Sequence, residues 1–308
     1  MSAPPMKIRA LAPWFGGKRT LAPRIVRELG EHRAYDEPCC GSASVLFAKP
    51  RCDVETVNDL HGDLVNLAMV VASDQCAELW SRAHTVLICE DTLRAYQRDI
   101  RSDFDDCPAA PDDVEASHVD RALQYLAMSW LGRNGTAGSE RVNYQVAVRW
   151  TQGGGSPAIR WQSVLDSIPA WHERLRGVVI LRRDLFDILP RLADEHGRAI
   201  YVDPPYFKET RGSGGGSRYL YDFDDEHHAR LAQELQRFKR ARVVVSYYDD
   251  LRLEALYPGW TLSVIERHKH LATQNKRGTT RDTVREVLAI NGPSYTQGAT
   301  LFDGGSDA

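Results

Sequence analysis

Residues 34–71 alternate between strand-like and helix-like segments in an order that few folds share. An apolar run at Ala34–Asp36 leads into the glycine-bearing stretch EPCCGSAS, and a helical pattern begins at Ser44–Ala48. The short strand VETVND then ends in an acid and precedes a second helical pattern over residues 60–71. Strand, glycine turn, helix and acid-tipped strand form half of a nucleotide-binding α/β unit, so this run predicts a Rossmann-like sheet.

The alternation stops after about residue 75. Residues 76–101 and 117–131 carry leucines, alanines and aromatic residues at three- and four-residue spacing, which predicts helices. Polar glycine-rich loops, including TQGGGSPAIRW, surround a short β-like run at Tyr144–Trp150. This middle third therefore predicts a mostly helical inserted module.

Strand–helix alternation resumes near residue 177. The predicted strands are GVVILRRD, RAIYVDPPY and ARVVVSYY, with a short helix at Leu185–Ala193 and a helix at 224–240 that Asp224 caps. Two late strands, WTLSVIERH and VREVLAIN, could pair antiparallel. We expect a discontinuous α/β domain at residues 1–78 and 177–292, an inserted target-recognition domain at 79–176 and a flexible tail at 293–308.

Charge is unevenly distributed along the chain. The net charge is −3, but residues 133–183 are rich in arginine, and residues 267–285 are rich in arginine and lysine. A polarised molecule with two basic segments can bind a polyanion despite its overall charge, although such segments are often only solvated surfaces.

Composition excludes several classes of protein. No run of 18 apolar residues and no secretory signal are present, so we expect a cytoplasmic protein that does not span a membrane. The six cysteines form no CxxC pair and show no zinc-ligand spacing, which predicts reduced thiols and no metal site. No feature indicates an obligate protein partner.

The glycine turn EPCCGSAS favours a cofactor without a phosphate. Ala43 stands where a GxGxxG turn has its second glycine, so close approach to a pyrophosphate is not expected. The stretch APWFGGKRT likewise lacks the first glycine and the Ser or Thr of a Walker A loop. Asp59, at the tip of the second strand, could accept hydrogen bonds from two ribose hydroxyls, or could instead cap the following helix.

The stretch AIYVDPPYFKET places an acid, two prolines and a tyrosine directly after an apolar strand. Proline cannot donate to a sheet ladder, so Pro204 and Pro205 end the strand abruptly. The Asp203 carboxylate and the Pro204 carbonyl could accept both N–H hydrogens of an amine on a planar ring, while Tyr206 stacks on that ring. The nitrogen lone pair would then turn out of conjugation and toward an electrophile. The alternative is a proline-rich turn that only closes the strand.

Six motifs, in order from about Pro13 to Asn291, resemble those of the DNA adenine methylase (Dam) family. They are PWFGGK, YDEPCCGSASVLF, VNDLHGDLVNL, LRRDLFDIL, DPPY and HKHLATQNKRGTTRDTVREVLAIN. The resemblance implies methyl transfer from S-adenosylmethionine to the exocyclic amine of adenine in double-stranded DNA. The implied cofactor contacts are Trp14, Lys18, Glu37, Pro38, Gly41, Asp59, Asp184 and Asp203, and the implied catalytic residues are Asp203, Pro204, Pro205 and Tyr206.

An adenine amine inside a duplex is not accessible to a methyl donor in line, so the base must be flipped out. Candidate DNA contacts are Arg133, Asn134, Arg141, Lys276 and Arg277, each of which could equally be a solvated surface residue. The stretch WLGRNGTAGSERVNYQ matches the family's DNA-contacting loop only loosely, so the recognised sequence does not follow. Two alternatives remain: methylation of a cytosine amine or an RNA base by the same chemistry, or a catalytically silent DNA-binding relative.

Overall fold

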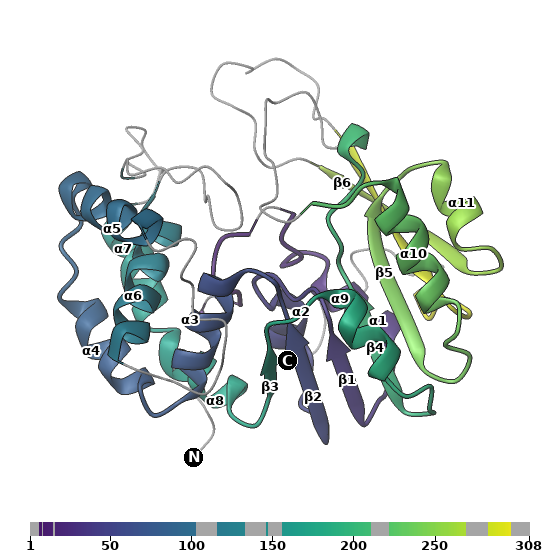
Figure 1. The fold of residues 1–308 in the computed structure, drawn as a ribbon, viewed down its shortest axis with the longest axis horizontal. Helices are drawn as coiled ribbons and strands as arrows, with labels where there is room; N and C mark the ends of the chain where they lie inside the picture. Colours follow the sequence, from purple (N-terminus) through teal and green to yellow (C-terminus); the bar gives the residue numbers. More distant parts are fainter. Residues whose placement is uncertain are drawn as a thin grey trace, which may run out of the picture.

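The computed structural model describes residues 6–7, 9–14, 16–102, 116–132, 146, 156–210, 222–268 and 283–296. The described strands form one seven-stranded sheet in the order β3-β2-β1-β4-β5-β7-β6 (Figure 1). They are β1 (Ala34–Glu37), β2 (Val54–Asn58), β3 (Val179–Leu181), β4 (Arg198–Val202), β5 (Arg242–Tyr248), β6 (Thr261–His268) and β7 (Thr283–Ile290). Strands β1 to β5 pair in parallel, and β7 lies antiparallel between β5 and β6, as the two late strands predicted.

Strand β1 lies where the strand order reverses. It pairs with β2 on one side and with β4 on the other, so that Tyr35 lies opposite both Glu55 and Ala199. Strand β4 is buried from Ala199 to Val202, which is typical of a parallel strand covered on both faces. Because ligands of open α/β sheets bind at the carboxyl ends of the strands beside such a reversal, the functional site is expected after β1, β2 and β4.

Helices lie on both sides of this sheet. They are α1 (Ala22–Leu29), α2 (Ser44–Ala48), α3 (Gly62–Ala72), α4 (Cys76–His84), α5 (Glu90–Ser102), α6 (Ala116–Leu131), α7 (Pro157–Leu165), α8 (Ile168–Leu175), α9 (Leu185–Ile188), α10 (Asp225–Leu235) and α11 (Arg252–Leu256), with 3-10 turns η1 (Leu189–Arg191) and η2 (Lys208–Thr210). Helices α4 to α7 gather beyond α3, whereas α10 and α11 lie toward β5 and β6 (Figure 1). Within the described part of the chain, no helix combines the length and apolar character needed to cross a membrane.

The helical middle third differs in two places from the prediction. The helix expected over 76–101 is interrupted between the end of α4 at His84 and the start of α5 at Glu90. The loop expected at TQGGGSPAIRW instead turns helical from Pro157, because the Ser156 hydroxyl accepts the backbone N–H of Ala158 at 3.2 Å. Serine followed by proline is a common helix start, although the neighbouring glycines favour a loop.

Other local predictions are confirmed or lie outside the described residues. The Asp224 carboxylate accepts the backbone N–H of His227 at 2.9 Å and caps α10 as predicted. Of the β-like run at 144–150 the structure describes Val146, which forms an isolated bridge with Gly132.

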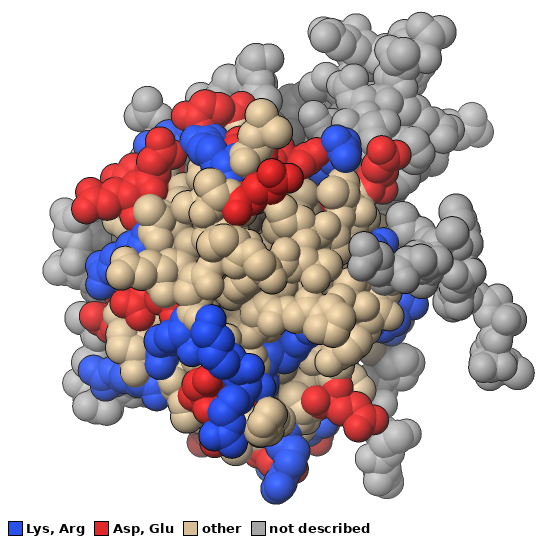
Figure 2. All heavy atoms as spheres, turned by 90° about the vertical axis from the view of Figure 1, so that its right-hand side faces the viewer, with Lys and Arg blue, Asp and Glu red and all other residues tan. Residues whose placement is uncertain are grey.

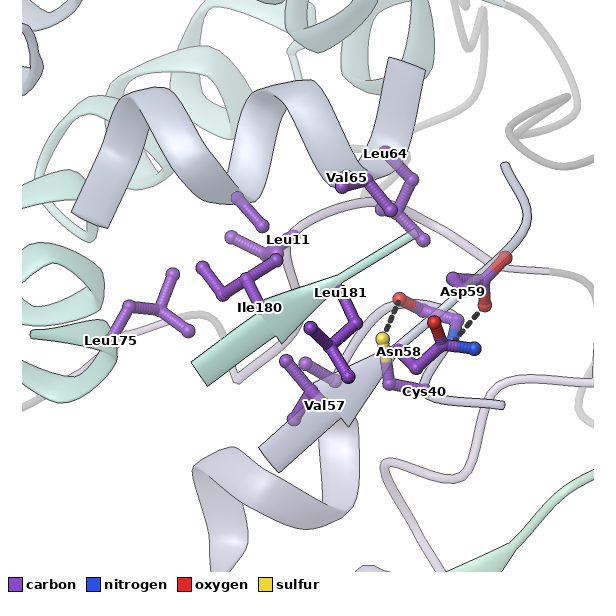
Figure 3. A pocket seen from close by; sticks show the side chains of 13 residues that line it. Leu11, Cys40, Val57, Asn58, Asp59, Leu64, Val65, Leu175, Ile180 and Leu181 are labelled. Atoms are coloured by element: carbon purple, nitrogen blue, oxygen red, sulfur yellow. Dashed lines mark hydrogen bonds between the residues drawn. The ribbon is translucent and has the colours of Figure 1, made fainter. Parts of the chain in front are cut away.

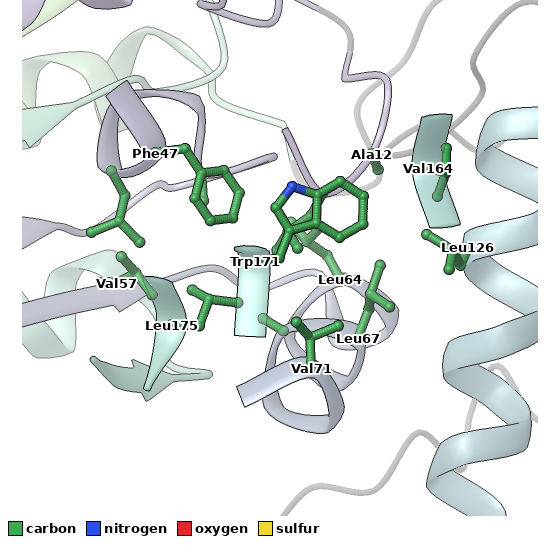
Figure 4. Close-up of a cluster of buried hydrophobic side chains, with 14 of the residues drawn as sticks. Ala12, Phe47, Val57, Leu64, Leu67, Val71, Leu126, Val164, Trp171 and Leu175 are labelled. Atoms are coloured by element: carbon green, nitrogen blue, oxygen red, sulfur yellow. The ribbon is translucent and has the colours of Figure 1, made fainter. Parts of the chain in front are cut away.

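The core is built from large side chains on both faces of the sheet. Trp171 of α8 is fully buried and lies among residues from α2, α3 and α6, with its ring stacked on Phe47 at 6.5 Å between ring centroids (Figure 4). On the β4–β5 side, Tyr247, Phe238 and Leu231 belong to a second buried cluster. The helices of the middle third therefore share a core with the sheet.

The first residues of the segment expected to form a flexible tail are held in place. The buried carboxylate of Glu28 accepts the Ser294 hydroxyl at 2.6 Å and the backbone N–H of Tyr295 at 2.9 Å, and it also bonds Thr296. Arg242 lies 3.4 Å from the same carboxylate. These contacts join residues 294–296 to α1.

Candidate active site

The carboxyl ends of β1, β2 and β3 are tied together by one buried amide. Asn58, the last residue of β2, donates through Nδ2 to the Pro38 carbonyl at 2.8 Å and to the Arg183 carbonyl at 3.0 Å. Its Oδ1 accepts the backbone N–H of Arg183 at 2.8 Å. Asn58 therefore fixes the backbone around Pro38 and just before Asp184, two of the predicted cofactor contacts. Asn58 is not among the predicted site residues, although an amide directly before an acid at a strand tip is a visible signal.

Asp203 follows β4 at the same edge of the sheet, and both of its carboxylate oxygens have partners. The Ser246 hydroxyl donates to Oδ1 at 2.7 Å, and the Lys18 ammonium lies 2.9 Å from Oδ2. Ser246 lies on β5, is fully buried and also contacts the Tyr201 hydroxyl at 2.9 Å. Ser246 was not predicted, because a lone serine within an apolar strand carries no positional signal.

Lys18 connects the PWFGGK segment to the catalytic motif. Its side chain is 4% exposed, and its ammonium donates to the Gly16 carbonyl at 2.6 Å as well as contacting Asp203. The same ammonium lies 4.8 Å from the ring centroid of Tyr206, within cation–π distance. Predicted as a cofactor contact, Lys18 here joins the residues predicted to hold the target amine.

Tyr206 is buried rather than displayed to solvent. Its ring meets Tyr248 edge-on at 4.6 Å and lies 5.9 Å from Tyr247, both on β5. Pro204 is also buried, and Pro205 is half-buried. A planar ring can therefore stack on Tyr206 only if the groups that cover it move.

The glycine turn after β1 adopts left-handed backbone at two positions. Gly41 has φ +46°, and Ala43, which precedes α2, has φ +57°. A Cβ atom on residue 41 would come within 2.8 Å of the Trp14 indole nitrogen, so Gly41 is needed for this close approach. The structure thus brings together Trp14 and Gly41, two of the predicted cofactor contacts.

Asp59 is bound to this turn. Its Oδ2 accepts the Gly41 N–H at 2.8 Å, and its Oδ1 accepts the His61 N–H at 2.9 Å. Burial raises the pKa of Asp59, and these backbone donors oppose that rise. The side chain that caps α3 is His61, whose Nδ1 accepts the Leu64 N–H at 3.3 Å, so Asp59 is not the cap itself. The backbone N–H of Leu60 also lowers the pKa of Asp59, so three backbone donors share the four lone-pair positions of the carboxylate and one position is left for a hydroxyl donor.

The two remaining acids are used locally. Glu37 is buried and accepts the Tyr35 hydroxyl at 2.8 Å; burial raises its pKa to about 8, with the nearby Asp203 carboxylate adding to the rise. Asp184 caps α9 by accepting the Phe186 N–H at 2.7 Å. The predicted site residues thus surround the ends of β1, β2 and β4, although several already have protein partners.

A small cavity lies behind the turn, between α3 and strands β2 and β3 (Figure 3). Its volume is about 10 Å³, and Gly41, Asp59, Leu64 and Leu181 are among its lining residues. A space of that size holds about one water molecule, so this cavity is a gap in the core and not the place of a nucleoside.

The predicted DNA contacts lie outside the described residues; they are Arg133, Asn134, Arg141, Lys276 and Arg277. On the face turned to the viewer in Figure 2, the side of α10 and α11, the described residues show a broad uncharged centre. Lysines and arginines are densest toward the lower edge and acids toward the upper edge, with some charges of the opposite sign in each region (Figure 2). The described part of this face is therefore not the continuous basic surface that a DNA backbone requires.

The fold and the site together define a class of protein. The sheet is parallel from β3 to β5, and its last strand, β7, inserts antiparallel between β5 and β6. A DPPY motif follows β4 and a glycine turn follows β1. This is the architecture of an α/β methyltransferase. The model of the D12 class N6 adenine-specific DNA methyltransferases matches residues 14–272, and the chain belongs to this family. It is therefore an enzyme that methylates adenine in DNA, as the resemblance to DNA adenine methylases implied.

Relatives from distant organisms match along nearly the whole chain. The DNA adenine methylase of Vibrio cholerae serotype O1 is 25% identical over 302 residues, covering 95% of this chain and 99% of that protein. The Type II methyltransferase M.MjaIII of Methanocaldococcus jannaschii is 26% identical and covers 93% of this chain and 100% of its own. The Type II methyltransferase M1.LlaDCHI of Lactococcus lactis subsp. cremoris is 25% identical over 293 residues.

Proposed function

We propose that the enzyme transfers the methyl group of S-adenosylmethionine to the exocyclic amine of an adenine that has been flipped out of duplex DNA. Asp203 and the Pro204 carbonyl accept the two N–H hydrogens of that amine, and Tyr206 stacks on the base. Trp14, Gly41 and Asp59 hold the methyl donor, together with Glu37, Pro38 and Asp184.

The observation that carries this proposal is the fixed carboxylate of Asp203. Ser246 and Lys18 hold its two oxygens at 2.7 and 2.9 Å, so its orientation is set before any substrate arrives. The glycine turn follows the neighbouring strand β1 at the same edge of the sheet. An acceptor for the target amine and a turn for the donor are therefore adjacent, which in-line methyl transfer requires.

The residues near the turn fit S-adenosylmethionine chemically. The close approach at Gly41 brings backbone and the Trp14 indole together, and the carboxylate of Asp59 can accept a hydroxyl donor at the tip of β2. When bound, this cofactor supplies an electrophilic methyl group on a sulfonium. The protein's part is to orient the amine lone pair toward that methyl and to stabilise the cationic nitrogen with Asp203. The proton can then leave without a strong base.

Base flipping and the arrangement of domains complete the proposal. The groups that cover Tyr206 move aside when the extruded base enters, and unstacking that base from the duplex costs a few kcal/mol. Residues 1–78 and 177–292 form the catalytic domain, and residues 79–176 recognise the target. The residues that contact DNA are Arg133, Asn134, Arg141, Lys276 and Arg277.

The test is incubation of the purified protein with unmethylated genomic DNA and S-adenosylmethionine labelled in its methyl group. The DNA is digested to nucleosides, and the labelled species is identified by mass. We expect N6-methyladenine, and sequencing of the same DNA then gives the recognised site. Label on the cytosine amine, or label on RNA alone, would change the proposed substrate. Cofactor binding without any transfer would indicate a silent DNA-binding protein.

A further inference from the structure

We propose that His61 is a positioning residue for the methyl-donor site. Its imidazole fixes the Trp14 indole against the glycine turn and links that turn to helix α6. The inference rests on the proposed function, because it takes Trp14 and Gly41 as contacts of S-adenosylmethionine.

His61 lies at the junction of β2 and α3, two residues after Asp59. It is 8% exposed, and its Nδ1 accepts the Leu64 N–H at 3.3 Å. An accepting Nδ1 carries no proton, so the imidazole in this contact is neutral. Burial also lowers the pKa of His61, although the Asp63 and Asp59 carboxylates act in the opposite direction. The ring therefore contributes mainly its shape and its aromatic faces.

Two aromatic side chains flank this ring. Trp14 meets it edge-on, with 5.6 Å between ring centroids and an interplanar angle of 76°, and Tyr125 of α6 lies 5.5 Å away at 42°. The Trp14 indole in turn lies against Gly41, since a Cβ atom there would approach its nitrogen to 2.8 Å. A continuous row of contacts thus runs from Tyr125 through His61 and Trp14 to the glycine turn.

Polar contacts hold the same two regions together on either side of the row. Arg121 of α6 pairs with Asp63, both largely buried. The Trp130 indole N–H donates to the Leu11 carbonyl at 3.0 Å, and the Leu11 N–H donates to the Ser42 carbonyl at 3.0 Å. Helix α6 is therefore fixed against the turn, and this fixed helix gives the His61 ring a rigid support from which to position Trp14.

A helix cap alone does not require histidine. Capping α3 requires an acceptor for a backbone N–H, and asparagine supplies one from a shorter side chain. Asparagine lacks the ring that meets Trp14 and Tyr125. The substitution His61→Asn therefore separates the two roles, because it keeps an acceptor and removes the ring, whereas His61→Ala removes both.

The control is a second, more exposed histidine–tryptophan pair on α4. His84 meets Trp80 edge-on at 4.4 Å and 72°, and its Nδ1 lies 2.7 Å from the Trp80 carbonyl oxygen. The substitution His84→Asn thus removes the same kind of ring contact away from the glycine turn. It reports any effect on folding that comes from losing such a pair.

The experiment measures the dissociation constant of S-adenosylmethionine by calorimetry, and the midpoint of thermal unfolding, for the full chain and the three variants. We expect His61→Asn to raise the dissociation constant about three- to tenfold, as the loss of an aromatic pair predicts. Its unfolding midpoint should fall by no more than about 5 °C, since the cap is kept and each lost ring contact costs about 1 kcal/mol. His84→Asn should bind like wild type.

The outcomes separate this inference from the proposed function. An unchanged affinity for S-adenosylmethionine in His61→Asn would overturn the inference, because His61 would then act only as a helix cap. The same holds if only His61→Ala binds more weakly and its unfolding midpoint is lowered. If the wild-type chain itself does not bind S-adenosylmethionine, the donor assignment fails, and the inference fails with it.

Discussion

The Lys18 ammonium lies 2.9 Å from Oδ2 of Asp203, although the two residues belong to motifs far apart in the chain. This ion pair joins the PWFGGK segment to the tip of β4, and the ammonium also lies over the Tyr206 ring. Lys18 therefore touches two of the residues that we assign to the target amine. Its role extends beyond the cofactor contact that the family resemblance implied.

The substitution Lys18→Met tests that wider role. Methionine keeps most of the buried stem but removes the charge, so Asp203 loses one of the two partners that orient it. We expect kcat at saturating S-adenosylmethionine to fall at least tenfold, about 1.4 kcal/mol of transition-state stabilisation. Single-turnover rates at several donor concentrations measure this. A change confined to the donor KM would show that Lys18 acts on the cofactor alone.

The substitution Asp203→Asn separates target chemistry from donor binding. Asparagine matches the carboxylate in shape, but it replaces one acceptor oxygen with a donor and cannot stabilise a cationic nitrogen. We expect methyl transfer to fall at least a hundredfold, in line with the loss of one preorganised electrostatic group. Donor affinity, measured by calorimetry, should remain within about tenfold of wild type. An equal loss of affinity and activity would assign Asp203 mainly to the cofactor.

Removal of the Ser246 hydroxyl should weaken catalysis without unfolding the protein. Ser246→Ala deletes the donor to Asp203 Oδ1 and leaves the Lys18 pair intact. We expect kcat to fall about tenfold, roughly the effect of one charge-assisted hydrogen bond. Ser263→Ala on β6, where the hydroxyl accepts from Arg24 at 3.1 Å, is the control for loss of a buried serine. Equal kcat values in the two variants would contradict a positioning role for Ser246.

The sequence predicted those parts of the fold that local signals determine. Apolar runs located β4 and β5, and Asp224 marked the start of α10 because a cap and its helix are neighbours in the chain. The start of α7 was missed although Ser156 and Pro157 signalled it, because the preceding glycines suggested a loop. The interruption between α4 and α5 was hidden by a helical spacing that continued through it.

The sequence proposes which residues make up the candidate site, but it does not predict which of them contact one another. The motifs give Asp203, Tyr206, Gly41 and Asp59 as candidates one by one. Which of them touch depends on the order of strands in the sheet, and a parallel sheet joins distant segments through crossovers that local periodicity does not encode. Contacts such as Ser246 with Asp203 therefore appear only once the strands are placed.

Glu37 makes stability depend on pH. Its pKa in the folded protein is raised from 4.5 to about 8, so between those values the folded chain holds a proton that the unfolded chain has released. Stability therefore falls as pH rises through that window, by up to about 1.4 kcal/mol per pH unit from this group. We expect Glu37→Gln, which stays neutral, to gain stability relative to wild type between pH 5 and pH 8.

Urea unfolding of both proteins at several pH values measures the effect of Glu37. The quantity to follow is the difference in free energy of unfolding between the variant and wild type, because other groups titrate equally in both. A difference that stays constant across the window would mean that Glu37 is ionised in the folded protein.

Ala43 should tolerate glycine better than an ordinary buried alanine does. Its left-handed backbone costs an L-residue about 1 kcal/mol or more, and glycine removes that cost. This gain offsets the lost methyl burial and the added freedom of the unfolded chain. We expect Ala43→Gly to change the free energy of unfolding by less than about 0.5 kcal/mol. Ala68 lies in the interior of α3 and, like Ala43, lines the small cavity behind the glycine turn. We expect Ala68→Gly to lower the free energy of unfolding by about 1–2 kcal/mol. If urea unfolding gave equal losses of unfolding free energy for the two variants, the turn at Ala43 would carry no strain.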